Sequence, residues 1–154
     1  MPWFRASTSS TAVVAAARPE VWAALTDPAL VASLTPLVHS ITPSGGTWMW
    51  EMARVPVLGT SVTPAFTERK TFTEQTRIDY EHAPPAGSTE RTGVDGCYEL
   101  SDADGGTHLA ISLTVRAKLP VTSAAGPAVR VAMKTVMAQM GAGFSRNLLR
   151  HLDA

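Results

Sequence analysis

The chain has 154 residues, of which 45% are hydrophobic and 17% are charged, and its 13 basic side chains balance its 13 acidic ones. This length and composition are typical of one folded domain, so we expect residues 1–154 to form a single domain. A formal net charge of zero provides no field that would attract a nucleic acid or an anionic membrane surface, and we expect neither as a partner.

The cysteine content and the amino-terminal residues indicate in which cellular compartment the protein is expected. Cys97 is the only cysteine, so no internal disulfide can form and nothing requires an oxidising environment. Residues 12–17 are apolar but too few, and too close to a run of hydroxyl side chains, for a signal peptide. No window approaches the roughly 18 apolar residues of a membrane span. We therefore expect a cytoplasmic protein without a membrane span.

A strand and two short helices are predicted at the amino end. Residues 9–16 are rich in Thr and Val, which favours a first strand. Pro19 is typical of a first helical turn and predicts a short helix that ends at Asp27. A second short helix is expected over residues 28–34, and Pro36 ends it.

The middle of the chain alternates with a period of two and predicts hairpins. The last hairpin is the clearest, because Leu109, Ile111, Leu113 and Val115 share one face of its second strand while polar side chains take the other. One face of the sheet is therefore expected to be apolar. The expected strands are 38–42 with 47–53, 62–72 with 76–82, and 94–101 with 107–119.

A long helix is predicted to close the chain. No proline follows Pro127, and the roughly 26 residues that remain would make a helix about 39 Å long. Its apolar side chains recur at steps of three and four and form one stripe: Val129, Met133, Val136, Met137, Met140, Phe144 and Leu148. This order of elements predicts an α+β fold in which the helix covers the apolar face of an antiparallel sheet.

Several short motifs follow one another in a distinctive order. The most specific is Arg18-Pro19-Glu20-Val21-Trp22, followed by Leu25-Thr26-Asp27. Further matches are Ile41, Gly45-Gly46 with Trp48, Gly96-Cys97-Tyr98-Glu99-Leu100, the residues 105–109, Leu119-Pro120 and Asn147-Leu148-Leu149. With these motifs the chain resembles the START-like, or helix-grip (SRPBCC), superfamily, especially its polyketide cyclase/dehydrase and lipid-transport group.

This resemblance implies the architecture and the place of a ligand. The expected fold is a curved antiparallel sheet of about six to seven strands wrapped on a long C-terminal helix, with two short helices after the first strand. A cavity between sheet and helix would hold an apolar or amphipathic small molecule. The fold hosts carriers, receptors and enzymes, so it does not by itself decide the function.

Candidate ligand-binding residues are the side chains expected to face this cavity. The methionines of the helix stripe have flexible thioethers that can adapt to a ligand, and the two indoles beside Met52 offer a stacking surface. Ordinary core packing is the alternative for both groups. The full set is Trp48, Trp50, Met52, Phe66, Tyr80, His82, Tyr98, Met133, Met137, Met140 and Phe144.

Small residues in the closing helix suggest room beside it. Ala132, Ala138 and Ala142 supply little side-chain volume. Gly141 and Gly143 each cost about 1 kcal/mol relative to Ala in a helix interior, so a bend or a close backbone approach would explain them.

Tyr80 and His82 are candidates for proton transfer. They share a strand face with Ile78, so an inward-facing Ile78 would bring a phenol and an imidazole into the cavity. An imidazole there could bind a ligand or move a proton near pH 7. For His82 we favour the alternative, a solvated strand end.

Glu68, Arg69 and Lys70 form a charged segment in a predicted strand. Glu68 and Lys70 share parity with Phe66 and Phe72, which would place two charges in the cavity unless a bulge changes the register. We expect a solvated face for this segment instead.

The expected function is that of a carrier or binding protein for a hydrophobic small molecule or lipid. The alternative is a polyketide cyclase/dehydratase in which His82, helped by Tyr80, Glu68 or Arg69, moves protons. Inward charges would favour the enzyme, and an all-apolar cavity would favour the carrier. The four histidines show no metal-ligand spacing, so we expect neither a metal nor a cofactor. A monomer or a homodimer is expected.

Overall fold

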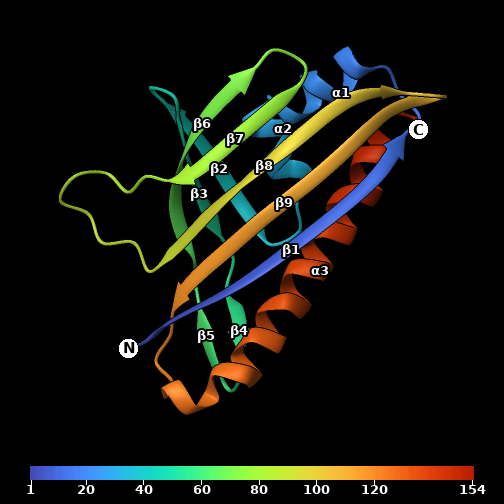
Figure 1. The fold of residues 1–154 in the computed structure, drawn as a ribbon. Helices are drawn as coiled ribbons and strands as arrows, with labels where there is room; N and C mark the ends of the chain where they lie inside the picture. The colour runs from blue at the N-terminus through green and yellow to red at the C-terminus, as the bar shows by residue number, and fades with distance from the viewer.

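The computed structural model describes residues 1–154 and has the α+β helix-grip arrangement expected from the sequence (Figure 1). One antiparallel sheet of seven strands has the order β1-β9-β8-β7-β6-β3-β2, and β4 and β5 form a separate two-stranded ribbon. The strands are β1 (Trp3–Val14), β2 (Val38–Ser44), β3 (Thr47–Met52), β4 (Val55–Val57), β5 (Thr60–Val62), β6 (Ala65–Thr73), β7 (Arg77–His82), β8 (Thr92–Ala103) and β9 (Gly106–Lys118). The helices are α1 (Arg18–Leu25), α2 (Pro28–Leu34), the short 3-10 helix η1 (Ser123–Ala125) and α3 (Gly126–His151).

The first strand is longer than predicted. It begins at Trp3 rather than near residue 9 and pairs with β9 without interruption from Trp3 opposite Lys118 to Val14 opposite Thr107. Phe4 and Ala6 are buried, whereas the Ser and Thr residues of the strand are mostly exposed. The run of hydroxyl side chains hides this amphipathic pattern in the sequence, and the backbone hydrogen bonds to β9 stabilise it.

The start of the predicted strand 62–72 is wrong. In the sequence, the ribbon β4–β5 comes before β6, and β6 begins only at Ala65, after Pro64. Pro56 weakens the strand pattern of β4 because proline cannot donate a ladder hydrogen bond. The ribbon is held instead by tertiary burial, since Val55 and Val57 are 5% and 6% exposed.

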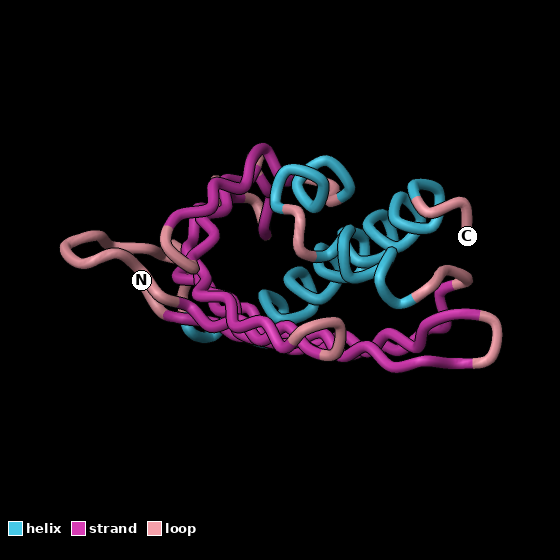
Figure 2. Tube along the Cα trace, turned by 90° about the horizontal axis from the view of Figure 1, so that it is seen from above, coloured by secondary structure: helices cyan, strands magenta, loops and turns pink.

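Helix α3 lies on the concave side of the curved sheet, the side on which α1 and α2 also lie (Figure 2). A Cβ added at Gly143 would come within 2.3 Å of Cγ of Pro36, so the close backbone approach predicted for this glycine is confirmed. Gly141, Ala138 and Ala142 face solvent, so the idea that they make room beside the sheet is wrong.

The apolar core consists of two clusters placed along α3. The larger one has 19 buried residues and includes Phe144 and Leu148 near the end of the helix. The smaller one has 7 buried residues and includes Val129 and Met133 near its start. Met52 packs against both clusters from the sheet side. The apolar interior is therefore divided, and the site described next adjoins the larger cluster.

No helix of the structure combines the length and the apolar character that crossing a lipid bilayer requires.

Candidate functional site

A carboxylate and an amine are buried together on the inner face of β6. The side chains of Glu68 and Lys70 are each 3% exposed, and Nζ of Lys70 lies 3.2 Å from Oε1 of Glu68. The solvated face expected for this segment is therefore wrong. The reason is register: β6 pairs with β3 and β7 without a bulge, so both residues stay on the same face as the buried Phe66. Arg69 is exposed and points away from them.

Four aromatic rings surround the Lys70 amine. Nζ lies 4.5 Å from the ring centres of Trp48 and Tyr80, 5.8 Å from that of Trp50 and 6.0 Å from that of Tyr98. The pairing brings them together, because Lys70 is opposite Tyr80 on β7 and Trp48 on β3 is opposite Glu68. The faces of these rings attract a cation. We call these six residues, Glu68, Lys70, Trp48, Trp50, Tyr80 and Tyr98, the Lys70 cluster.

The indole nitrogen of Trp50 is buried without a hydrogen-bond partner, and Oε1 of Glu68 has only the Lys70 amine, 3.2 Å away, as a partner. The Tyr80 hydroxyl, in contrast, donates a long hydrogen bond of 3.4 Å to the carbonyl oxygen of Ser112. An unpaired buried polar atom costs about 1–3 kcal/mol, and such atoms are uncommon in folded proteins. The cluster therefore offers an acceptor and a donor to a polar group that enters the interior.

Burial controls the protonation of the Lys70 cluster. Desolvation raises the pKa of Glu68, and the neighbouring Lys70 offsets only part of this effect. Desolvation likewise lowers the pKa of Lys70, and Glu68 again opposes the shift. Burial also raises the pKa of Tyr80 and of Tyr98, so both phenols remain protonated at neutral pH. The site thus holds an amine and a carboxyl group whose charged forms are both disfavoured by burial, beside two hydroxyl donors.

Gly96 permits the position of Tyr80. A Cβ at Gly96 would lie 2.9 Å from Cε2 of the Tyr80 ring and 2.2 Å from the carbonyl oxygen of Ser112. Without a side chain at residue 96, the phenol crosses β8 and its hydroxyl reaches β9. The motif that contains Gly96 therefore has a structural role in the Lys70 cluster that the sequence alone did not reveal.

His82 belongs to a different group of residues. Its Nε2 lies 2.8 Å from Oε1 of Glu90, and that carboxylate also accepts hydrogen bonds from the backbone nitrogen and the hydroxyl of Thr67. The imidazole fills the place that a side chain on Gly93 would take, and the His82 side chain is only 12% exposed. The solvated strand end is therefore wrong. No hydrogen bond or ion pair connects His82 with the Lys70 cluster, so its role in proton transfer stays a prediction.

A strip of apolar residues on the inner face is only partly buried. It comprises Ile111, Leu113 and Val115 of β9, and Tyr98 of the Lys70 cluster adjoins it on β8 through the pair Tyr98 and Ile111. On α3, Met137 and Met140 are also only partly buried. Side chains that face the inside and yet remain accessible are typical of a surface on which a ligand can lie.

The other candidate ligand-binding residues are mostly buried. In the larger core cluster lie Trp48, Trp50, Phe66, Tyr80 and Phe144, and in the smaller one lies Met133. Met52 is partly buried between the clusters. Packing in the core and contact with a ligand are both compatible with these positions, so their ligand contacts stay predictions.

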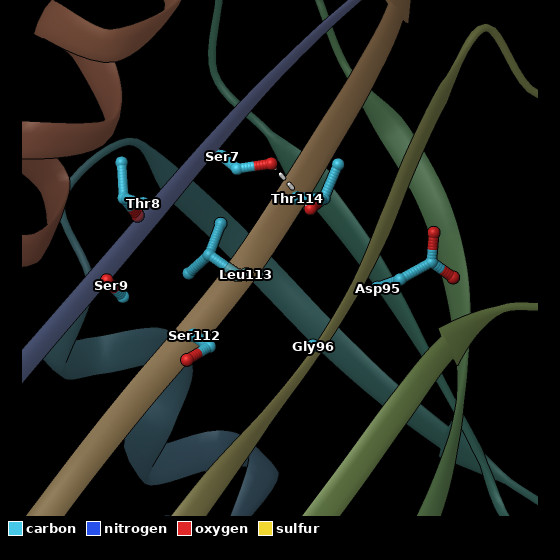
Figure 3. Close-up of a pocket in the computed structure, with 8 residues that line it drawn as sticks. All are labelled: Ser7, Thr8, Ser9, Asp95, Gly96, Ser112, Leu113 and Thr114. Carbon is cyan, nitrogen blue, oxygen red and sulfur yellow. Dashed lines mark hydrogen bonds between the residues drawn. The ribbon is translucent and has the colours of Figure 1, made fainter.

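Two depressions are present on the surface of the fold. One of about 360 Å³ is formed on the sheet by residues of β1, β8 and β9, among them Ser7, Asp95, Ser112, Leu113 and Thr114 (Figure 3). Another of about 540 Å³ adjoins the start of α1, where Arg18 pairs with Asp102. Both are open to solvent and neither is the apolar cavity expected beneath α3, which stays a prediction.

Titratable side chains do not gather elsewhere into a metal site: no three or more His, Cys, Asp or Glu residues are close enough to hold an ion.

Comparison with known proteins supports the fold and the family. A family model described as "Polyketide cyclase / dehydrase and lipid transport" matches residues 5–154. No curated protein sequence is significantly similar to the chain.

Solved structures with this fold include aromatase/cyclases. A START superfamily protein from Mycobacterium smegmatis has 15% identity and a TM-score of 0.69, over 96% of this chain and 97% of its own. The Zhui aromatase/cyclase from Streptomyces sp. R1128 has 16% identity and a TM-score of 0.65, over 97% of this chain and 94% of its own. The di-domain aromatase/cyclase BexL from the BE-7585A biosynthetic pathway has 18% identity and a TM-score of 0.67 over 98% of this chain, which spans only 51% of BexL.

Proposed function

The chain belongs to the polyketide cyclase / dehydrase and lipid transport family, and on that premise we propose that it binds an amphipathic small molecule between the sheet and α3. The apolar part of the ligand would lie on the strip formed by Ile111, Leu113 and Val115, with Met137 and Met140 opposite. Its polar part would point to the Lys70 cluster. As in other ligand sites, apolar contact would supply the affinity and a few polar groups the orientation.

The observation that carries this proposal is the unpaired indole nitrogen of Trp50, beside a Glu68 carboxylate paired only with Lys70 and next to partly accessible apolar side chains. A carbonyl or hydroxyl oxygen of the ligand could accept from the Trp50 indole, and a ligand hydroxyl could also donate to Oε1 of Glu68. Enclosing about 300 Å² of apolar ligand surface would contribute roughly 7 kcal/mol before ordering costs, at about 25 cal/mol per Å². We therefore expect micromolar affinity.

A second candidate function is an acid–base enzyme that acts on a polyketone. It is favoured by one observation, the inward charges of Glu68 and Lys70. A carboxyl group with a raised pKa can act as a proton donor, and an amine with a lowered pKa can act as a proton acceptor. Such proton transfer contributes typically about 10²–10⁴-fold to a rate. Zhui and BexL are named as aromatase/cyclases, but their similarity to this chain extends only to the fold and supports this candidate only by analogy.

Binding is tested with flavone, a flat aromatic ketone, by titration while the tryptophan fluorescence is recorded. The variant Leu113→Trp fills the strip and should weaken binding at least tenfold. The matched control is Val131→Trp, because Val131 is 67% exposed on α3 and should tolerate an indole without effect. Equal affinity of both variants and the wild type would contradict the proposed place of the ligand.

The two candidate functions are separated by Glu68→Gln. If the chain is a carrier, this variant binds flavone and no polyketone is converted by either protein. If it is an enzyme, the wild type converts a linear polyketone and the variant loses that turnover while flavone binding persists. Native mass spectrometry of protein purified from its own host would identify a molecule that is retained in the site.

A further inference from the structure

Lys70 differs from the other lysines of the chain in its surroundings. The three lysines are Lys70, Lys118 and Lys134, and only Lys70 is buried. A lysine ammonium has three hydrogen-bond donors, yet the only charged group at Nζ is the Glu68 carboxylate, 3.2 Å away. Aromatic rings lie around Nζ, and the faces of these rings offer no conventional hydrogen-bond acceptor. Burial leaves the ammonium poorly solvated. This desolvation favours the neutral, nucleophilic amine and outweighs the opposing attraction of the Glu68 carboxylate, although the ring faces also attract the cation.

We propose that Lys70 is a nucleophile that condenses with a ketone or aldehyde carbonyl of the bound molecule to form a Schiff base. This inference rests on the proposed function, because a ligand on the inner strip must bring its carbonyl carbon to Nζ. Binding alone requires only a polar contact with the Lys70 cluster, whereas this step makes a covalent bond to a single residue.

The step can be balanced with the groups present. Lys70 transfers a proton to Glu68, and the neutral amine attacks the carbonyl carbon, so that a C–N bond forms and the C=O π bond breaks. The nitrogen then gives a proton to the carbonyl oxygen, which becomes the hydroxyl of a neutral carbinolamine. The protonated Glu68 then returns its proton to that hydroxyl, which leaves as water. The products are a protonated Schiff base, the Glu68 carboxylate and one water molecule. No oxidant, reductant or metal takes part.

The rest of the cluster suits this chemistry. Desolvation lowers the pKa of Lys70, which increases the neutral fraction of the amine, in the way that buried lysines become nucleophiles in other enzymes. Tyr98 lies between the amine and the accessible strip, and its phenol stays protonated and can donate to the carbonyl oxygen. The indoles of Trp48 and Trp50 keep bulk water from the bond that a water molecule would hydrolyse.

The test uses benzoylacetone, an aromatic β-diketone. A primary amine condenses with it and loses one water molecule, and the product rearranges to a conjugated enaminone that survives digestion. The wild-type protein should gain the mass of one benzoylacetone minus one water at pH 7, and peptide mapping should place it on Lys70. Lys134, which is exposed, is the internal control in the same sample.

Two variants complete the test. Lys70→Arg keeps the charge, and the rate of adduct formation should fall at least a hundredfold in this variant. Lys134→Arg should form the adduct at the wild-type rate. Glu68→Gln should slow adduct formation at least tenfold. The mapping on wild-type protein decides the matter even where a variant does not fold.

The possible outcomes separate the two proposals. An adduct confined to Lys70 supports the inference. Saturable flavone binding with no adduct, or with adducts spread over Lys118, Lys134 and the amino terminus, overturns the inference and leaves the proposed function standing. A wild-type protein that neither binds flavone nor forms the adduct overturns both.

Discussion

Replacing Lys70 by methionine isolates the energetics of the buried pair. Methionine keeps most of the side-chain volume, so little of the effect comes from packing. The change leaves Glu68, whose side chain is 3% exposed, as a buried carboxylate without its partner. Breaking a buried ion pair in this way costs about 3–5 kcal/mol, a large part of the roughly 5–15 kcal/mol that stabilises a typical domain. Lys70→Met should therefore fold, but with much reduced stability at pH 7.

The assay is urea unfolding followed by tryptophan fluorescence, with the free energy of unfolding taken from the midpoint at constant slope. The matched control is the double variant Glu68→Gln, Lys70→Met, which has the same shape and no charge. A buried amide is less costly than a buried carboxylate, so the double variant should recover about 2 kcal/mol. The difference between the two variants reports the ionisation of Glu68 alone.

The pH dependence has a defined sign. Burial raises the pKa of Glu68 in the folded protein above its reference value of 4.5, and removing Lys70 takes away the largest opposing effect. A raised pKa means that the folded state prefers the protonated carboxyl, so Lys70→Met should be most stable below about pH 4.5 and lose stability as pH rises through the folded-state pKa. Each unit of separation between folded and unfolded pKa is worth about 1.4 kcal/mol.

Two results would refute this reasoning. One is a Lys70→Met protein as stable as the wild type at pH 7. The other is a stability difference between the single and the double variant that does not change from pH 7 to pH 5. The first would mean that Glu68 is solvated or already neutral in the folded protein, and the second would mean that its folded-state pKa is not raised.

Two further predictions concern packing. Gly143→Ala should lower stability by about 1–3 kcal/mol, because its Cβ would come within 2.3 Å of Cγ of Pro36; Gly141→Ala, in the same helix with open space around it, should raise stability by about 0.5–1 kcal/mol. Equal melting temperatures for the two variants would contradict this. Glu90→Gln removes the charge that His82 and the neighbouring strand contact, so limited trypsin digestion should cut loop 83–91 faster than in the wild type; an unchanged rate would mean that Glu90 does not hold the loop.

Local sequence patterns were sufficient for most of the elements. Pro19 and Pro28 mark the starts of α1 and α2, and the apolar stripe with Pro127 predicts α3 close to its observed bounds. Local sequence patterns failed to predict strands that are stabilised mainly by tertiary contacts. In β1, exposed hydroxyls mask a strand that β9 stabilises, and in β4 two buried valines outweigh a proline.

The candidate site was only partly visible in the sequence. Tyr80, Trp48 and Trp50 were expected to face the interior, and they do. Glu68 and Lys70 were expected to be solvated because two charges seldom enter a core. The available signal was that Phe66, Glu68 and Lys70 occupy alternate positions of one strand and therefore share a face. In the structure that face is buried, although charged residues are usually exposed.

Periodicity along one chain thus determined the α+β class, the long helix and the apolar face of the sheet, because these depend on neighbours a few residues apart. The chemistry of the interior depended on contacts that no local pattern records. Only the register of β6 against β3 and β7 decided that a lysine and a glutamate are buried among four aromatic rings. A change of register by one residue would have placed both charges in water, since successive side chains on a strand point to opposite faces.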